Sequence, residues 1–138
     1  MYARLILLCF ALMLFSCSKD NEDRIPNVYV DFRIGLIEFD SKSVNGLLLV
    51  DKGANRGVAG LIIYKIANNN YVAFDRCSSV NPRQQCAVIP DDPNLTATDP
   101  CSGAKFWLYD GSPAKAPAKR GLKQYNVIIA NLQLSVTN

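Results

Sequence analysis

The 138-residue sequence contains no histidine. Serine and cysteine triads, HExxH zinc sites and histidine-ligated cofactors all need an imidazole, so these classes of active site are excluded. Charge of one sign is also scarce, because 15 basic and 12 acidic residues give a net charge of only +3, too little to indicate a nucleic-acid partner. The length suffices for one hydrophobic core but not for two, and we expect one folded domain.

Long apolar runs are also absent, apart from one run of 11 residues from Leu5 to Phe15 that follows Arg4. This run is too short to span a bilayer comfortably, and its positive start is typical of a signal peptide, which we assign to residues 1–16. It ends in Leu14-Phe-Ser-Cys17, which resembles the lipobox of bacterial lipoproteins, with the lipid on Cys17. The alternative is an ordinary secretory leader, or a retained membrane helix, in which Cys17 has no role.

Residues 17–26 are interpreted as the lipidated cysteine and a polar tether. Ser18-Lys-Asp-Asn-Glu-Asp-Arg24 is too polar to pack into a core. Its acidic content resembles the export signal of Bacteroidetes lipoproteins that reach the cell surface. We therefore expect an outer-membrane lipoprotein of the cell envelope, held to the membrane by its lipid and facing either the periplasm or the cell surface.

Three cysteines remain once the leader is removed and Cys17 is acylated: Cys77, Cys86 and Cys101. Export places them in a compartment that permits disulfides, and an odd number predicts one disulfide and one free thiol. Free cysteine is ordinarily a buried small apolar residue, although Cys77 is also a candidate redox thiol. A zinc site made of the three cysteines and Asp99 lacks the paired C-x₂₋₄-C spacing of structural zinc sites, so we assign no metal.

From residue 27 onward the sequence predicts short strands and turns, without a convincing helical period. Strands are expected at residues 28–36, 46–50, 61–66, 71–75, 105–109, 124–129 and 132–136. The asparagine-rich segment 67–70 predicts a hairpin, because asparagine tolerates the positive φ of tight turns. The last two strands are expected to form a second hairpin, on a sheet that has one face exposed to solvent.

The segments between these strands are expected to be irregular. Residues 77–100 contain four prolines and predict a long loop. Residues 113–117 begin and end with proline and predict an extended crossover outside the sheet. The sum, over residues 27–138, is an all-β fold: a small antiparallel β-sandwich or barrel.

Two surface features are candidates for binding. Trp107 and Tyr109 alternate with Phe106 and Leu108, so one pair belongs to the core and the other pair is a candidate docking patch. Basic residues surround the crossover and form either its solvated face or a contact for an anionic partner or lipid headgroups. These residues are Lys115, Lys119, Arg120 and Lys123.

The order of several short motifs resembles one family. The motifs are Cys77-Ser-Ser79, Asp99-Pro-Cys-Ser-Gly-Ala-Lys-Phe106, Asp110-Gly111, and Gly121-Leu-Lys-Gln-Tyr125 before the final hairpin. They resemble the Rieske [2Fe-2S] iron–sulfur domain, whose boxes are Cys-x-His-x-x-Cys and Cys-x-Cys-His-Gly-Ser-x-Phe. The resemblance covers residues 28–138 in strand layout and implies a Rieske-type β fold.

The resemblance is degenerate at the cluster ligands. Cys77 matches the ligating cysteine of the first box. Ser79 and Ser102 fall where the two histidines stand, and Asp99 falls where the second ligating cysteine stands. A Rieske centre needs two thiolates on one iron and two imidazoles on the other, so this match implies that the iron–sulfur cluster is lost and that no cofactor is bound.

The same match places Cys101 at the position of a bridging cysteine of the second box. Its partner position in the first box is Pro82, but Cys86 follows four residues later. The resemblance therefore implies a disulfide between Cys86 and Cys101, in place of the family's bridge between the two loops. A bond between Cys77 and Cys101 is the competing pairing.

Together these features predict a non-catalytic, lipid-anchored envelope protein with a degenerate Rieske-like domain. Such a protein acts as a binding or assembly component for an unknown envelope protein, not for nucleic acid. The alternative is an electron-transfer protein of the envelope, based on a Rieske-type [2Fe-2S] cluster or on the thiol of Cys77 with that of Cys86 or Cys101.

Overall fold

The computed structural model describes residues 24–138, so the expected signal peptide and Cys17 lie outside the described residues. Its elements, in chain order, are β1 (Asp31–Gly35), α2 (Leu36–Lys42), β2 (Leu47–Val50), β3 (Leu61–Ala67), β4 (Asn70–Asp75), the 3₁₀ helix η2 (Pro82–Gln84), β5 (Ile89–Pro90), β6 (Thr96–Thr98), β7 (Lys105–Trp107), β8 (Pro113–Lys115), β9 (Gln124–Ala130) and β10 (Gln133–Thr137). Within this range, no helix has the length and apolar character to cross a bilayer.

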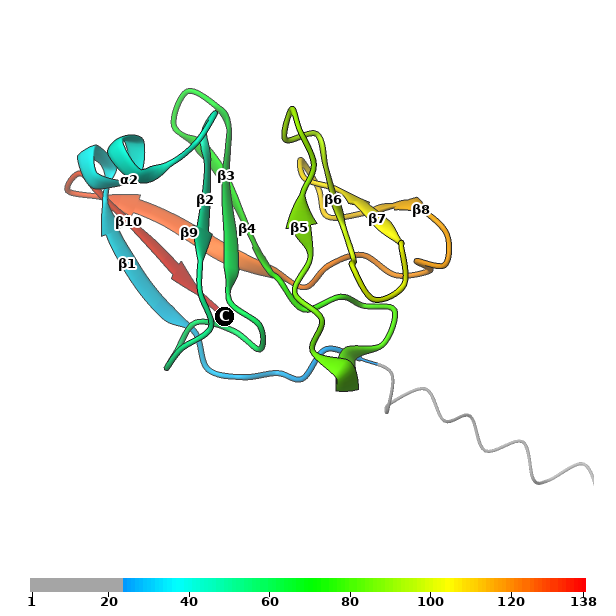
Figure 1. Cartoon of the computed structure of the whole chain (residues 1–138). Helices are drawn as coiled ribbons and strands as arrows, with labels where there is room; N and C mark the ends of the chain where they lie inside the picture. Colours follow the sequence, from blue (N-terminus) through cyan, green and yellow to red (C-terminus); the bar gives the residue numbers. More distant parts are fainter. Residues whose placement is uncertain (1–23) are drawn as a thin grey trace, which may run out of the picture.

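The strands form two sheets, seen on the left and right of Figure 1. The larger sheet has six strands in the order β1-β10-β9-β4-β3-β2, and the smaller has four in the order β5-β6-β7-β8. Every ladder between these strands is antiparallel. The expected all-β, antiparallel fold is confirmed.

Two main clusters of apolar side chains hold the sheets together, and β3 contributes to both. Leu61 and Ile63 point into the cluster enclosed by the larger sheet and α2, while Ile62 points into the cluster shared with the smaller sheet. Successive side chains of a strand point to opposite faces of the sheet. A strand that is buried on both faces therefore appears in the sequence as an uninterrupted run of apolar residues. Phe106 of β7 and Leu108, just after that strand, are fully buried in the shared cluster.

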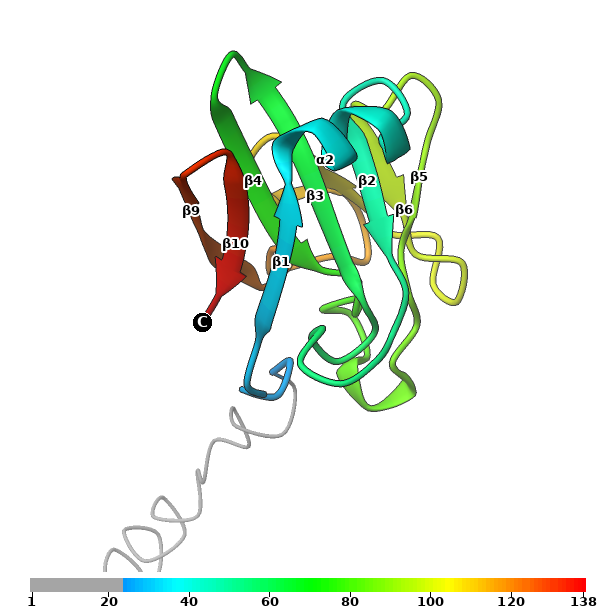
Figure 2. The same cartoon turned by 90° about the vertical axis from the view of Figure 1, so that its left-hand side faces the viewer.

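The helix α2 corrects the expectation that the domain has no helix. It has seven residues, and Phe39 is its one buried side chain, with the ring packed edge-on against Tyr71 at 5.2 Å between centroids. A helix of two turns with a single core residue leaves no repeating 3.6-residue pattern in the sequence. Figure 2 shows α2 at one end of the molecule and the start of the described chain at the other.

The smaller sheet corrects two further expectations. Strands β5 and β6 lie within residues 77–100, which were expected to be irregular, and β8 lies within the expected crossover. β5 and β8 are the two edges of this sheet, where a proline without an N–H group is tolerated. β5, β6 and β8 have two or three residues each and show no alternation in the sequence, whereas β7 was expected because the alternation there continues through residue 109.

The two expected hairpins are confirmed as β3–β4 and β9–β10. Asn131 and Leu132 form the second turn with φ of 51° and 60°, the left-handed conformation that two-residue hairpin turns require. The alternation over residues 106–109, in β7 and just after it, is resolved in favour of Phe106 and Leu108 as core, since Trp107 and Tyr109 are 37% and 53% exposed.

Candidate functional site at the two loops

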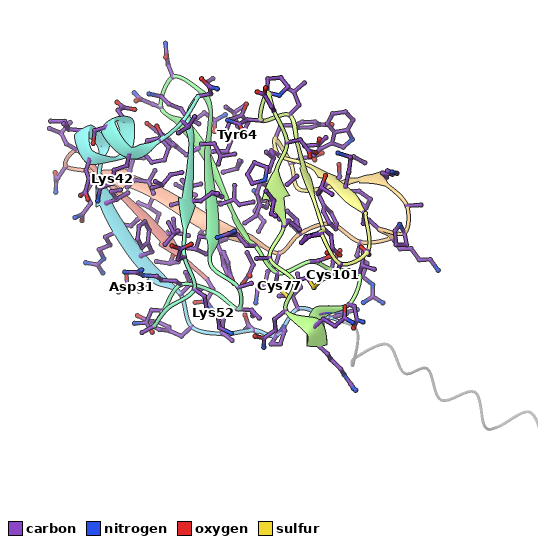
Figure 3. The ribbon with its side chains drawn as sticks, viewed as in Figure 1. Asp31, Lys42, Lys52, Tyr64, Cys77 and Cys101 are labelled. Carbon is purple, nitrogen blue, oxygen red and sulfur yellow. A yellow bond between two sulfur atoms is a disulfide. The ribbon has the colours of Figure 1, made fainter. Side chains whose placement is uncertain are left out.

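Two loops meet at the end of the molecule opposite α2. The first, residues 76–88, follows β4, and the second, residues 99–104, connects β6 to β7. The first loop folds back on itself, because the backbone N–H of Ser78 donates to the carbonyl of Cys86 at 2.8 Å. Figure 3 labels one cysteine of each loop, Cys77 and Cys101, at this lower end of the view.

A disulfide joins the loops through Cys86 and Cys101, whose Cα atoms are 6.3 Å apart. Within residues 24–138, Cys77 is the free cysteine, and it is completely buried. Its thiol points to the carbonyl oxygens of Pro82 and Ser78, at 3.6 and 3.7 Å. Burial, together with the charges of two nearby aspartates, raises the pKa of Cys77 to about 12, so it stays a protonated thiol at neutral pH.

Asp99, at the start of the second loop, is 1% exposed and accepts hydrogen bonds from both loops. The hydroxyl groups of Ser78 and Ser102 donate to Oδ2 at 2.7 and 2.5 Å, and the backbone N–H of Cys101 donates to Oδ1 at 2.8 Å. Burial alone would raise the pKa of Asp99. The hydrogen bonds from Ser102, Ser78 and the backbone outweigh burial and hold the pKa below its usual value.

Ser79 does not join this network. Its hydroxyl donates to the carbonyl of Arg120 at 2.6 Å, on the other side of the first loop. Ser78 stands beside Asp99 instead, and sequence reasoning missed it. No sequence signal marks Ser78, because its position follows from the folding back of the first loop, in which Cys77 forms an isolated bridge with Ala87 and the N–H of Ser78 donates to the carbonyl of Cys86.

The donor set at the loops does not fit a Rieske cluster. Within residues 24–138, the one group of potential metal ligands with atoms within 4.8 Å of each other is Cys86, Asp99 and Cys101. Both sulfur atoms are in the disulfide, and the whole sequence has no imidazole. Ser78 and Ser102 donate directly to Asp99, so the position between the loops is closed by side-chain hydrogen bonds.

A second buried aspartate, Asp75, holds the start of the first loop, and no sequence pattern indicated this role. Asp75, at the end of β4, is fully buried. Its Oδ1 accepts the N–H groups of Ala59 and Cys77 at 3.1 and 2.8 Å. Its Oδ2 accepts the N–H of Val58 at 2.6 Å and the hydroxyl of Tyr125 at 2.8 Å. Asp75 therefore fixes the first loop to the larger sheet.

The sequence matches no protein-family model and no curated protein, whereas several solved structures share its architecture. One is the plasma membrane Rieske protein PetC3 of the cyanobacterium Synechocystis PCC 6803, with a TM-score of 0.58 and 20% identity over 81% of this chain and 100% of that chain. The chain has a Rieske-like fold.

Rieske-type ferredoxin structures show the same likeness. The ferredoxin of carbazole 1,9a-dioxygenase from Nocardioides aromaticivorans has a TM-score of 0.51 and 13% identity, over 78% of this chain and 96% of that chain. A chain from the complex of reduced oxygenase and oxidized ferredoxin in carbazole 1,9a-dioxygenase has a TM-score of 0.53 and 16% identity, over 78% and 93%. At these identities the likeness establishes the fold alone, which confirms the Rieske-type β fold that the motif resemblance implied.

Proposed function

We propose that this chain is a non-catalytic, lipid-anchored protein of the cell envelope, whose Rieske-like domain has lost its iron–sulfur cluster and serves as a binding or assembly component. The observation that carries this proposal is the network in which Ser78 and Ser102 both donate to buried Asp99 beside the Cys86–Cys101 disulfide. This network ties the two loops together without metal.

The chemistry of the loops supports the loss of the cluster. Two thiolates and two imidazoles hold a Rieske centre, and two sulfurs here are bonded to each other. The remaining thiol, Cys77, has a pKa of about 12 because it is buried. A serine hydroxyl is a hard, neutral and weak donor for iron, and both Ser78 and Ser102 are already committed to Asp99.

The same contacts support a non-catalytic role. General acid–base catalysis needs a group whose pKa lies near the working pH and that reaches a substrate. Asp99 is held ionised by its donors and is enclosed, and the Cys77 thiol is held protonated and is equally enclosed. Neither group matches that requirement.

Iron and acid-labile sulfide, measured together with the absorption spectrum of protein purified from its own host, test the loss of the cluster. We expect no stoichiometric iron and no visible absorption bands. Iron and sulfide near two per chain would contradict the proposal and establish the electron-transfer alternative. Thiol titration of the same sample tests the thiol-based alternative. We expect one reactive thiol, that of Cys77, and only after the protein is unfolded.

Membrane fractionation of a Cys17→Ala variant tests the anchor. We expect the variant to lose membrane retention, because the tether is too polar to bind a bilayer by itself. Cys9→Ala, which changes a cysteine of the expected leader, is the matched control and should fractionate like the wild type. Retention of Cys17→Ala in the membrane would disprove lipid anchoring at this residue.

A further inference from the structure

The two sheets have four edge strands, and three of them carry residues that discourage pairing with a further strand. β1 contains the charged residues Asp31 and Arg33. β5 and β8 each contain a proline, Pro90 and Pro113, which has no N–H group to donate. Charges and prolines are the means by which natural proteins keep an edge strand from pairing with another chain.

The fourth edge, β2, has neither of these features. Its sequence is Leu-Leu-Leu-Val, its ladder with β3 has no bulge, and Leu49 is 41% exposed. Figure 2 shows β2 beside β3, at the margin of the larger sheet and below α2. An apolar edge strand of this kind is a template on which a strand of another chain can pair.

The backbone of β2 has a donor and an acceptor that face away from the sheet. Just before β2, the carbonyl of Gly46 accepts the N–H of Lys65 at 2.8 Å. Backbone groups alternate in direction along an antiparallel strand, so those of Leu47 and Leu49 point outward. Leu47 exchanges two hydrogen bonds with Val44, at 2.9 and 3.0 Å. The N–H and C=O of Leu49 have no hydrogen-bond partner among the described residues.

Two cavities lie along this edge, and Leu48 and Leu49 line both of them. The β1-side cavity, of about 380 Å³, lies between β2 and β1. The β5-side cavity, of about 330 Å³, lies between β2 and β5 of the smaller sheet. Successive side chains of a strand point to opposite faces, so the side chains of a strand added to β2 alternate between the two cavities.

The β5-side cavity suits an apolar side chain. Its walls include Val44, Leu47 and Ile89, and Val44 and Ile89 are 69% and 53% exposed. The side-chain amide of Asn94 donates to the carbonyl of Val44 at 3.0 Å, which joins the smaller sheet to the turn before β2. This bond holds the two walls of the cavity at a fixed separation.

The β1-side cavity suits a carboxylate. The charged residues that line it are Arg33, Glu38, Lys42, Asp51 and Arg56. Four of them are in ion pairs: Arg33 with Asp31 at 3.0 Å, Lys42 with Glu38 at 2.5 Å, and Asp51 with Arg76 at 3.3 Å. Arg56 forms no ion pair within residues 24–138, and its Cζ lies over the ring of Phe32, 5.9 Å from the centroid. A guanidinium group binds a carboxylate through two parallel hydrogen bonds.

We propose that β2 accepts an extended segment of a partner protein as an additional strand, paired with Leu49, in which acidic and apolar residues alternate. A carboxylate of this segment binds Arg56 in the β1-side cavity, and an apolar side chain fills the β5-side cavity. The proposal rests on the proposed function of a binding component, for which it names the surface and the chemistry of the partner. In strand addition, main-chain hydrogen bonds supply affinity and pockets for alternate side chains supply specificity.

Two other occupants match the cavities less well. The β2 edge of a second copy, Leu47–Val50, has no carboxylate for Arg56. The expected tether, residues 18–24, contains Asp20, Glu22 and Asp23 but no apolar residue for the β5-side cavity. A partner segment with both kinds of side chain is the occupant that fits both cavities.

Amide hydrogen exchange of the mature lipoprotein in uncharged detergent micelles, followed residue by residue by NMR, tests the pairing. The probe is the end-blocked peptide Val-Glu-Val-Glu-Val, in large excess. We expect the N–H of Leu49 to exchange about tenfold more slowly with the peptide than without it, because the N–H becomes hydrogen-bonded. The amides of β8, a proline-containing edge, are the internal control and should not change. Unchanged exchange at Leu49 would overturn the proposal.

The variant Arg56→Glu tests the carboxylate site by fluorescence anisotropy of the labelled peptide. We expect it to bind Val-Glu-Val-Glu-Val about tenfold more weakly than the wild type does, and Val-Lys-Val-Lys-Val more tightly. Lys115→Glu, on β8, makes the same change of charge at another edge and should leave both affinities unchanged. Thermal unfolding checks that both variants are folded, as expected for exposed positions. Equal effects of the two substitutions would overturn the role of Arg56.

Exchange of Leu49 without the peptide identifies the other occupants. Slow exchange that depends on protein concentration would show that a second copy pairs with β2. Slow exchange that becomes fast when Asp20, Glu22 and Asp23 are changed to asparagine would show that the tether does. Either result would overturn the proposal. Iron and sulfide in the same sample decide the proposed function separately: an iron-free protein whose Leu49 does not respond to the peptide keeps the proposed function and loses this site.

Discussion

Two buried aspartates, each next to one of the two loops, hold the molecule in different ways. Asp75, at the end of β4, accepts three backbone N–H groups and the hydroxyl of Tyr125. Asp99, which follows β6, accepts one backbone N–H group by direct contact and two serine hydroxyls. Almost any sequence can provide backbone donors at a given place in the fold, but the serine donors exist only where the sequence places serine.

The two aspartates therefore have different roles: Asp75 belongs to the scaffold of the fold, and Asp99 belongs to the candidate site. Asp75 connects the first loop to the larger sheet, and its role does not depend on what the two loops hold between them. The motif resemblance places Asp99 and Ser102 at cluster-ligand positions of the family's second box, and in the structure Asp99 connects the loops through its hydrogen bonds with Ser78 and Ser102. We infer that Asp75 maintains the Rieske-like fold, while Asp99 and the disulfide link the two loops to each other, the role that the proposed function gives them in place of a cluster.

The largest effect is expected at Asp75. In Asp75→Asn, one oxygen becomes an NH₂ group that faces two donors, whichever way the amide is turned. We expect the free energy of unfolding to fall by about 4 kcal/mol, since each buried donor left unsatisfied costs about 1–3 kcal/mol and the NH₂ group also opposes them. Urea denaturation measures the change.

Tyr125→Phe provides the control for Asp75, because it removes one of the four donors and leaves the carboxylate in place. We expect a loss of about 1.5 kcal/mol, within the range for one hydrogen bond to a charged group. A loss below about 1 kcal/mol in Asp75→Asn would show that the scaffold does not depend on this carboxylate, and would remove the contrast with Asp99.

The disulfide should have the next largest effect. Replacement of Cys86 and Cys101 by serine opens a loop with a sequence separation of 15 residues, which the chain-entropy model values at about 3 kcal/mol. The matched control is Cys77→Ser, which changes the free cysteine and should leave the bond intact. If the double variant is as stable as the wild type, the loops are held by the Asp99 network alone.

The sequence was sufficient to predict the strands of the larger sheet, but only β7 of the smaller one. In the larger sheet, the hairpins at 61–75 and 124–137 are long enough to show alternation and have asparagine in their turns. The strands β5, β6 and β8 have two or three residues, and their pairing depends on contacts with distant segments. Short strands of this kind leave no local pattern, so they were expected as loop and crossover.

The residues of the candidate site also divide into those that the sequence predicted and those that it did not. Cys86, Asp99, Cys101 and Ser102 were expected at the loops from the resemblance, and the structure brings them together. Ser78 and Asp75 were not expected, because their roles follow from the course of the first loop. A serine pair in a loop does not indicate which hydroxyl points inward, since the loop lacks the regular alternation of a strand.

The third prediction concerns Asp99→Asn. The amide oxygen can still accept both serine hydroxyls, but the NH₂ group then faces the N–H of Cys101, so we expect a smaller loss than at Asp75, about 2 kcal/mol at pH 7. The folded pKa of Asp99 lies below its unfolded value of about 3.9, so the contribution of this carboxylate is complete above that pH and is lost as the pH falls through the folded pKa.

Urea denaturation from pH 7 to pH 2 checks this sign. The difference in unfolding free energy between wild type and Asp99→Asn should be constant above about pH 5 and should shrink toward pH 2. A difference that grows as the pH falls would mean that Asp99 is stabilised in its protonated form. In that case the two serines would not act as donors to a carboxylate.

The smallest expected effect distinguishes the two neighbouring serines of the first loop. Ser78→Ala removes a buried hydroxyl that donates to Asp99, and we expect the free energy of unfolding to fall by about 1.5 kcal/mol. Ser79→Ala removes a more accessible hydrogen bond to the Arg120 carbonyl, and we expect a fall of about 0.5 kcal/mol. A double-mutant cycle should show coupling of about 1 kcal/mol between Ser78 and Asp99, and none between Ser79 and Asp99. If Ser79 is instead the coupled residue, the first loop follows the course that the family motif implies. Asp99 would then be linked to Ser79 and Ser102, the two residues that stand where the family has histidine.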